Sequence, residues 1–262
     1  MSTDIRSVDE RLNSQGAQKD ASHAHEIIGA GMRLLAKKVY EAFPLTPHPM
    51  AAPVHDYGSP DGNMRGSIRA SSGGPIDWAI DSWIAAPKGG FCNHHLTLWL
   101  TPEVKVPHLG LAIGTIPQLF FYCDLIPRGD LWTDTAQLDR YHGAFNQQFM
   151  AITADPRFRP FVSKEIYIRQ AISPSGLCLQ GEVDDKAIAD LLAICDQRLT
   201  QWITWVKEAE PVSEAERPAL AARDAQVRRT ICERDPANIV AERVLGAEMT
   251  RKLVNTLAAI GR

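Results

Sequence analysis

Five β-rich runs follow one another in the middle of the chain, and the segments between them are too short to hold a crossover helix. The runs cover residues 66–70, 76–85, 94–100, 109–115 and 119–125. Turn-forming segments such as SSGGP at 71–75 and PKGG at 87–90 separate them. Because parallel strands need a connection of about a dozen residues or more, these runs are predicted to pair antiparallel. Leu119, Phe120, Phe121 and Tyr122 are consecutive, which predicts a sheet covered on both faces.

Helical patterns surround this strand segment. Apolar residues at helical spacing predict helices at 27–43, 134–150, 184–207, 214–234 and 237–260, and one further strand is predicted at 165–173. A helix, then a sheet, then helices predicts an α/β protein, a three-layer α/β/α sandwich with a central antiparallel sheet. Residues 1–22 are polar and have no apolar period, so we expect a flexible N-terminal arm followed by a single domain at 23–262.

Charge and cysteine content exclude several classes of protein. The chain has 28 Lys and Arg against 31 Asp and Glu, a net charge of −3, so neither nucleic acid nor an anionic membrane is an expected partner. No apolar run approaches the ~20 residues that span a bilayer. The five cysteines form no C-x-x-C pair, which argues against a disulfide framework and a zinc ribbon and favours a reduced, cytoplasmic compartment.

The sequence does not fix the oligomeric state, and a homodimer stays an open alternative.

A set of short motifs occurs in a definite order along the chain. They are GPIDW at 74–78, SWI at 82–84, CDL at 123–125, PRGDL at 127–131, IRQAISP at 168–174, the Arg pair at 228–229, Asp235 and LGAE at 245–248. Together they resemble the red chlorophyll catabolite reductases of plants over about residues 55–260. The resemblance implies the fold of the ferredoxin-dependent bilin reductases, with a pocket between the sheet and the C-terminal helices.

The same resemblance implies a chemistry without flavin or metal. Ferredoxin supplies electrons, and acidic side chains of the protein protonate a bound linear tetrapyrrole. One of the two pocket acids of the family corresponds to Asp235. The other lies on the strand that corresponds to 108–115, where this chain has Gly110, Leu111, Ala112 and Ile113 and no carboxylate. The resemblance therefore implies the fold and half of the acid pair.

Two carboxylates are candidate catalytic residues. Asp77 stands between Ile76 and Trp78 in a predicted strand, so burial is expected to raise its pKa and suit it to acid/base work. Strand periodicity places it on one face with Asp81 and Trp83. Its alternative role is that of a structural partner for an arginine such as Arg69 or Arg169.

Asp235 precedes Pro236, and by itself this placement is typical of a cap for the last helix. The position in the family pattern favours catalysis instead.

The other candidates are a histidine, an arginine and two tryptophans. His94 and His95 are adjacent on a strand, so they point to opposite faces and cannot chelate one metal together, and no metal site is expected. His94 is interpreted as a core residue and His95 as the pocket candidate, a proton carrier. Arg169 is predicted on a strand, where it would bind a substrate anion or neutralise Asp77. Trp83 and Trp99 are candidates for binding a flat substrate.

Two enzyme hypotheses follow. The missing strand carboxylate and the absence of a cofactor motif favour a cofactor-independent carbon–carbon lyase on a flat aromatic substrate. The example considered is the opening of a lignin-derived phenylcoumaran dimer to a stilbene with loss of formaldehyde. Asp77 or Asp235 would be the base, and Arg169 or His95 would assist the departing phenolate. The alternative is a ferredoxin-dependent reductase of a linear tetrapyrrole.

A third hypothesis, from a different class, is a non-catalytic carrier of a pigment or an aromatic ligand. Such a carrier would bind the same ligands and would need no titrating acids.

Overall fold

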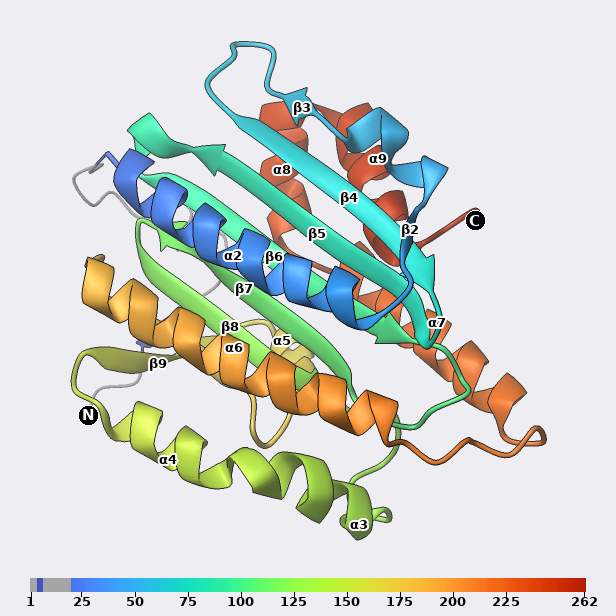
Figure 1. Cartoon of the computed structure of the whole chain (residues 1–262). Helices are drawn as coiled ribbons and strands as arrows, with labels where there is room; N and C mark the ends of the chain where they lie inside the picture. Colours follow the sequence, from blue (N-terminus) through green and yellow to red (C-terminus); the bar gives the residue numbers. More distant parts are fainter. Residues whose placement is uncertain (1–3, 7–19) are drawn as a thin grey trace.

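The computed structural model describes residues 4–6 and 20–262. Within these residues ten strands form one sheet, in the order β1-β9-β10-β8-β7-β6-β5-β4-β2, and β3 pairs with β4 (Figure 1). The strands are β1 (Asp4–Arg6), β2 (Thr46–Pro47), β3 (Tyr57–Gly58), β4 (Arg65–Gly73), β5 (Ile76–Ala86), β6 (Phe91–Leu100), β7 (His108–Ile116), β8 (Gln118–Ile126), β9 (Phe158–Ser163) and β10 (Leu177–Gly181). The predicted arm at 1–22 lies mostly outside the described residues.

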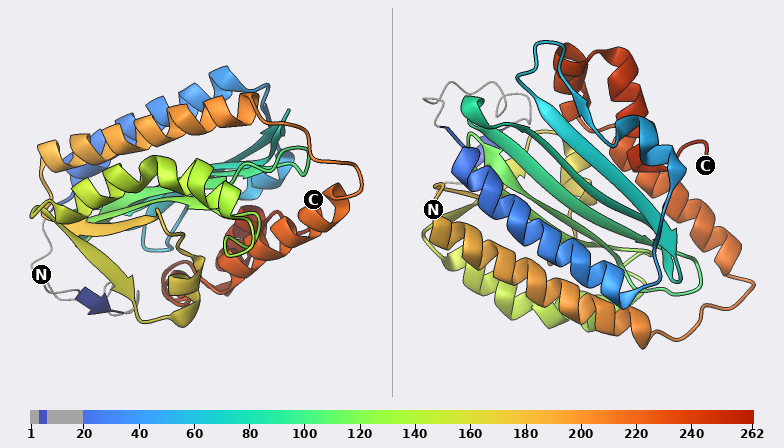
Figure 2. Two further views of the ribbon diagram at one scale, coloured as in Figure 1. Left: turned by 90° about the horizontal axis from the view of Figure 1, so that it is seen from below. Right: turned by 45° about the horizontal axis from the view of Figure 1, so that its top comes forward.

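The five predicted strands correspond to β4–β8, and each pairs antiparallel with the next. The antiparallel prediction is therefore confirmed. The sheet is extended by β10 and β9, which the sequence pattern did not indicate, and β1 joins β9 in parallel. The result is a mixed α/β fold in which a mainly antiparallel sheet is flanked by helices on both faces (Figure 2).

Helices α2 (Ser22–Ala42) and α6 (Asp185–Lys207) cover one face of the sheet, and α4 (Asn146–Ala154) lies beside α6 (Figures 1 and 2). Asp184 caps α6 by accepting hydrogen bonds from the backbone N–H groups of Lys186 and Ala187. The indole of Trp202 is fully buried in α6 and donates to the carbonyl of Pro107 at 2.8 Å. This face holds the larger apolar core of the described residues.

Helices α7 (Arg217–Glu233), α8 (Ala237–Leu245) and α9 (Ala247–Ala258) lie against the opposite face, which we call the C-terminal face (Figure 2, left). One helix was predicted over 237–260, but Gly246 separates α8 from α9. Its φ of +85° is a conformation that side-chain-bearing residues rarely adopt. The core on this face is smaller and includes Ile68, Trp78 and Ile80 from the sheet and Leu253 from α9.

Two other segments differ from prediction. Residues 165–173 were expected to be a strand, but Ile166–Ala171 form the helix α5. The helix predicted at 134–150 is instead a broken series: α3 (Thr135–Gln137), the π-helix η3 (Leu138–His142), the 3-10 helix η4 (Gly143–Phe145) and then α4. Two further 3-10 helices are η1 (Pro49–Val54) and η2 (Pro87–Gly89). The described part of the chain contains no helix with the length and hydrophobicity that crossing a membrane requires.

Candidate functional site

The strand β7, in the middle of the sheet, presents no bulky side chain on the C-terminal face between Gly110 and Gly114. On this face β7 presents Gly110, Ala112 and Gly114, while the alternate residues Leu109, Leu111 and Ile113 belong to the core beneath α2 and α6. No side chain on this face of β7 between Gly110 and Gly114 is larger than a methyl group. The strands on either side, β6 and β8, therefore border a central strip without bulky side chains of its own, which is buried and has the Tyr122 ring over its Gly110 end.

Polar side chains border this strip in one cross-strand row. The row consists of Ser82, His95, Ala112, Tyr122 and Cys178, each opposite the next in the register of β5, β6, β7, β8 and β10. His95 and Tyr122 are separated by two strand spacings, about 10 Å of backbone. Both side chains keep some solvent-accessible surface although they lie in the interior of the sheet. A flat molecule lying on Ala112 would thus have His95 on one side and Tyr122 on the other.

Burial sets the protonation of both bordering residues. It lowers the pKa of His95 to about 4, so the imidazole is neutral at pH 7. Burial also raises the pKa of Tyr122 well above its usual value, and the nearby Asp124 carboxylate raises it further. His95 and Tyr122 are therefore neutral groups that can donate or accept hydrogen bonds without placing a charge on this face.

Asp124 is fully buried on β8, on the same face as Tyr122 and directly opposite Gly110. The backbone N–H of Ser173 donates to its Oδ2 at 2.9 Å, and the Ser173 hydroxyl donates to its Oδ1. Burial raises the pKa of Asp124 to about 6, although the two hydrogen bonds from Ser173 and the charge of Arg198 oppose the rise. A carboxyl group with this pKa exchanges its proton close to neutral pH.

Asp235 lies in the short connection between α7 and α8, in the helical layer over the C-terminal face. Its Oδ1 accepts a hydrogen bond of 2.9 Å from the backbone N–H of Ala237, the first residue of α8. Burial raises the pKa of Asp235, and the charge of Glu165 adds to the rise, while the hydrogen bond from Ala237 opposes it. The helix-capping contact and a proton-holding carboxyl group are thus combined in one residue.

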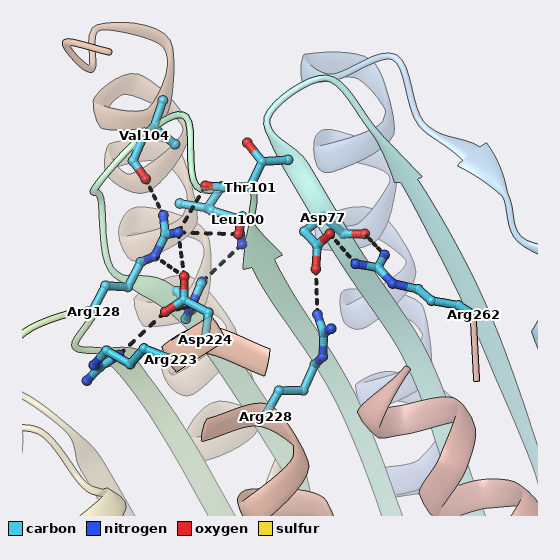
Figure 3. Close-up of polar contacts among 10 residues, drawn as sticks. Asp77, Leu100, Thr101, Val104, Arg128, Arg223, Asp224, Arg228 and Arg262 are labelled. Carbon is cyan, nitrogen blue, oxygen red and sulfur yellow. Dashed lines mark hydrogen bonds and ion pairs between the residues drawn. The ribbon is translucent and has the colours of Figure 1, made fainter. Parts of the chain in front are cut away.

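Asp77 is held in an ion-pair clamp with two arginines (Figure 3). It is the extra residue of a bulge between Ile76 and Trp78, so its side chain leaves the face that strand periodicity predicted and meets the C-terminal layer. Arg228 Nη1 donates to Asp77 Oδ2 at 2.7 Å, and Arg262 binds both Oδ1 and the backbone carbonyl of Asp77. The partners proposed from sequence, Arg69 and Arg169, are therefore wrong.

This clamp also explains why the pKa of Asp77 is not raised, as the sequence analysis expected. Burial alone would raise it, but the hydrogen bonds and charges of Arg262 and Arg228 outweigh burial and hold the pKa below the ordinary 3.8. Asp77 is thus ionised at neutral pH and saturated with donors. It is poorly suited to act as a base and well suited to attach α7 and the C-terminus to β5.

We expect Asp77→Asn to destabilise the fold by about 1–3 kcal/mol at pH 7, because Arg228 would remain buried without its anion. A group with a lowered folded-state pKa stabilises the protein above its unfolded pKa and loses this contribution as pH falls through the folded pKa. The difference between variant and wild type should therefore shrink below about pH 4. Urea unfolding at pH 7 and pH 3 measures this, with the exposed Asp139→Asn as control. An equal difference at both pH values would contradict the clamp.

A second buried ion pair fixes α7 to the loops beyond β6 and β8 (Figure 3). Arg128 is 1% exposed, and its Nε and Nη2 donate to Asp224 Oδ2 at 3.0 and 2.6 Å. Nη2 also donates to the carbonyl of Thr101 at 2.9 Å. His108 Nε2 lies 3.2 Å from Asp224 Oδ1, and its Nδ1 accepts the N–H of Leu100 at 3.0 Å. The accepting Nδ1 leaves the ring proton on Nε2, facing the carboxylate.

The structure corrects the strand predicted around Arg169 and places Trp83 and Trp99 apart from each other. Arg169 is on the helix α5 rather than on a strand, its side chain is exposed, and it donates to the carbonyls of Ser163 and Lys164. Trp83 and Trp99 lie on opposite faces of the sheet and cannot form one platform. Trp99 is buried on the C-terminal face against His108, with ring centroids 4.6 Å apart. The remaining site predictions, His95 and Asp235, are on or over the C-terminal face.

Trp83 instead borders a cavity of about 290 Å³ on the α2 side of the sheet. His94, which the sequence analysis placed in the core, is buried there, and its Nε2 lies 3.0 Å from Nδ1 of His25. Burial lowers the pKa of His94 to about 3, and the neighbouring His25 lowers it further. This cavity and the strip on β7 are separated by the sheet.

Sequence reasoning missed Tyr122 and Asp124 as site residues, although the signal for Asp124 was present. It is the one carboxylate in the strand Gln118–Ile126, where its neighbours Cys123 and Leu125 are fully buried. A carboxylate in such a strand is either paired or functional. Tyr122 could be found only from the cross-strand register with His95, which the sequence alone does not fix.

Comparison with known proteins places the chain in a family. The profile of the red chlorophyll catabolite reductases matches residues 30–259. The chain belongs to this family. It is 27% identical to the chloroplastic red chlorophyll catabolite reductase of Arabidopsis thaliana over 234 residues, covering 81% of this chain and 73% of the relative. The enzyme of Hordeum vulgare is 24% identical over 195 residues, covering 68% and 94%.

A solved structure shows the same fold. Phytochromobilin synthase from tomato, crystallised in complex with biliverdin, superposes with a TM-score of 0.73 at 13% sequence identity, covering 87% of this chain and 81% of that one. The predicted resemblance to the red chlorophyll catabolite reductases and to the bilin reductase fold is therefore confirmed. The prediction of a lyase for lignin-derived dimers is wrong, because the family found is one of reductases.

Proposed function

We propose that this protein reduces a linear tetrapyrrole with electrons from reduced ferredoxin, and that the tetrapyrrole lies on the C-terminal face of the sheet. We place the tetrapyrrole there because Gly110, Ala112 and Gly114 form a strip without bulky side chains between His95 and Tyr122. A flat conjugated molecule can lie against nearly bare backbone and meet hydrogen-bonding groups at its edges. The names of the two plant relatives support a red chlorophyll catabolite as substrate, and the biliverdin complex of the tomato enzyme supports the wider class.

The chemistry asks two things of the chain. Reduction of one carbon–carbon double bond consumes two electrons and two protons, and reduced ferredoxin delivers one electron at a time. The protein must therefore hold the tetrapyrrole in place and supply protons at defined atoms. Asp235 keeps its proton to a higher pH than an exposed carboxyl group does, which suits it to proton donation. Neutral His95 can hydrogen-bond the pyrrole or lactam groups without forming a charge.

Asp235→Asn is expected to lower the rate of tetrapyrrole reduction by about 100-fold or more, because the amide cannot donate an acidic proton. The amide oxygen can still accept the N–H of Ala237, so the cap of α8 should survive and the thermal midpoint should change little. Glu233→Gln, an exposed carboxylate at the end of α7, is the matched control and should retain full activity. Equal rates in all three proteins would remove Asp235 from the mechanism.

The function itself is tested with purified protein, biliverdin or red chlorophyll catabolite, and photoreduced ferredoxin, by following the absorbance of the tetrapyrrole. We expect binding without ferredoxin, seen as a shifted absorption band, and consumption only when reduced ferredoxin is present. Binding with no consumption under any reductant would instead support the pigment carrier. Absence of binding to both tetrapyrroles would contradict the proposed function.

A further inference from the structure

We propose that a chain of buried side chains carries protons around the start of β10 to Tyr122, which delivers them to the substrate on the C-terminal face. The chain runs through His142, Ser175, Ser173 and Asp124. This inference rests on the proposed function, because it assigns the route by which one of the two protons of each reduction reaches the tetrapyrrole.

Side-chain contacts join His142 to Asp124, and Asp124 neighbours Tyr122 on β8. His142 Nδ1 lies 2.9 Å from the hydroxyl of Ser175, and that hydroxyl lies 3.5 Å from the hydroxyl of Ser173. The Ser173 hydroxyl donates to the Asp124 carboxylate, and Asp124 stands two residues from Tyr122 on the same face of β8, where it raises the pKa of the phenol. His142, Ser173, Ser175 and Asp124 are each less than 10% exposed. A series of hydroxyl groups between an imidazole and a carboxyl group can pass a proton by successive rotation and transfer.

The register of the sheet explains how this chain passes from one layer to the other. The last pair between β8 and β10 joins Cys123 to Leu177, so Asp124 has no partner on β10. The loop that precedes β10 fills this place and brings Ser173 against Asp124, with Ser175 behind it. Gly176 permits the approach, because a Cβ on it would lie 2.8 Å from the Asp124 carboxyl carbon. Arg198 of α6 positions the loop by donating to the carbonyls of Cys123 and Ser175 at 3.1 and 3.0 Å.

The two ends of the chain have suitable chemistry. At the inner end, the Tyr122 ring lies over Gly110, where a Cβ would be only 3.0 Å from its Cε1, and Tyr122 as a whole is only partly buried. At the outer end, Nε2 of His142 is buried and has no hydrogen-bond partner within residues 4–6 and 20–262. Since Nδ1 is engaged with Ser175, the other ring nitrogen is free to take up the next proton.

Protonation states favour transfer towards Tyr122 below about pH 6, where Asp124 carries its proton. Burial lowers the pKa of His142 to about 4, so its ring is neutral and can relay a proton without storing charge. Asp124, with a pKa of about 6, is the member that exchanges its proton in this range. The titratable and charged groups around Asp124 are Arg198 from α6, Tyr122 and Cys123 on β8, and Cys178 on β10.

Each reduction transfers two electrons and two protons to the tetrapyrrole. Ferredoxin supplies two electrons to the tetrapyrrole. The O–H bond of Tyr122 breaks as a C–H bond forms on the substrate, and Tyr122 takes the proton of the Asp124 carboxyl group. Asp124 is then reprotonated from the Ser173 hydroxyl, which is refilled through Ser175 from His142, and the buried Nε2 of His142 takes up the replacement proton when the cover over it opens to solvent. The second proton of the reduction comes from Asp235 in the proposed function.

Two variants test the donor and its supply. Tyr122→Phe should lower the rate of biliverdin reduction by about 100-fold and leave binding intact, because only the hydroxyl is removed. The wild-type rate should fall above about pH 6, where Asp124 loses its proton. Ser173→Ala removes the hydroxyl that passes the proton to Asp124, so it should also lower the rate, and because it removes hydrogen bonding that favours the carboxylate, the remaining activity should fall at a higher pH than in the wild type. Tyr57→Phe, a half-buried tyrosine outside the chain, should change neither quantity.

A second measurement needs no substrate. The carbonyl stretch of a protonated carboxyl group, followed by infrared spectroscopy, should titrate near pH 6 in the wild type, disappear in Asp124→Asn and move upward in Ser173→Ala. If the wild type reduces biliverdin and Tyr122→Phe has the same rate and pH profile, the relay is wrong. The proposed function would not be affected by this result. A wild type that reduces neither tetrapyrrole would overturn the proposed function first, and the use of the relay with it.

Discussion

Replacing Asp224 by Asn should destabilise the fold by about 3–5 kcal/mol, because the guanidinium of Arg128 would remain buried without an anion. Arg128 is 1% exposed and binds Asp224 through two nitrogens, so no water can easily replace the lost charge. Burial would raise the pKa of Asp224, but His108 and Arg128 outweigh burial and keep it below the ordinary value. The carboxylate is therefore ionised and paired at neutral pH.

Urea unfolding followed by tryptophan fluorescence measures this loss. Glu233→Gln is the matched control, because it breaks an exposed pair with Arg229 and should cost less than about 1 kcal/mol. The double variant Arg128→Met with Asp224→Leu should be more stable than Asp224→Asn alone, since it leaves no buried charge unpaired. A single variant as stable as the control would show that the pair does not hold α7 to the sheet.

Gly114→Ala is expected to cost about 3 kcal/mol or more, for a different reason. A Cβ at this position would lie 2.0 Å from the carbonyl oxygen of Cys92 and 2.8 Å from the Cα of Asn93. Both are backbone atoms of β6, so no side-chain rotation can relieve the overlap, and β6 and β7 would have to separate. The β7 strip would be distorted with them, and tetrapyrrole binding should weaken.

Gly89→Ala is the control for this substitution. Nothing lies within 4 Å of a Cβ at Gly89, and its backbone is outside the positive-φ region, so the change should cost less than about 0.5 kcal/mol. Thermal unfolding of both variants, with biliverdin titrations on the folded proteins, distinguishes strand separation from a general intolerance of alanine. A stable Gly114→Ala variant would mean that β6 and β7 are more compliant than their close approach suggests.

The strands β4–β8 could be predicted because Gly, Pro and Ser mark the turns between them. The connections are also too short to hold a crossover helix, so parallel pairing is excluded. The segment 165–173 could not be predicted, because Ile166, Ile168 and Ile172 alternate with polar residues in a way that suits a strand. In the structure the short helix α5 leaves Ile166 74% exposed, and its position depends on packing beside β9. The strands β9 and β10 were missed because each is short, and because β10 joins the sheet by pairing with β8, far earlier in the sequence.

The site was predicted less completely than the sheet. His95 and Asp235 stay predictions: the sequence offers the first because it alternates with core residues on a strand and the second because it follows a family motif, and both are on or over the C-terminal face. Asp77 was assigned to the wrong face, since a single-residue bulge reverses the side-chain direction and leaves no mark on the apolar pattern. Tyr122 became visible only when the register placed it in one row with His95.

The two helical layers are attached to the sheet by different kinds of contact. Helix α6 buries Ala187, Ile188, Leu191, Cys195, Arg198, Leu199, Trp202, Ile203, Trp205 and Val206, whereas α7 buries only Leu220, Asp224 and Arg228. Helix α7 thus depends largely on buried ionic contacts that acid weakens, and little apolar area of its own resists its detachment. Amide hydrogens of α7 should therefore exchange through partial opening events while those of α6 require global unfolding. A large rigid pigment could enter and leave through the same fluctuations without disturbing the rest of the protein.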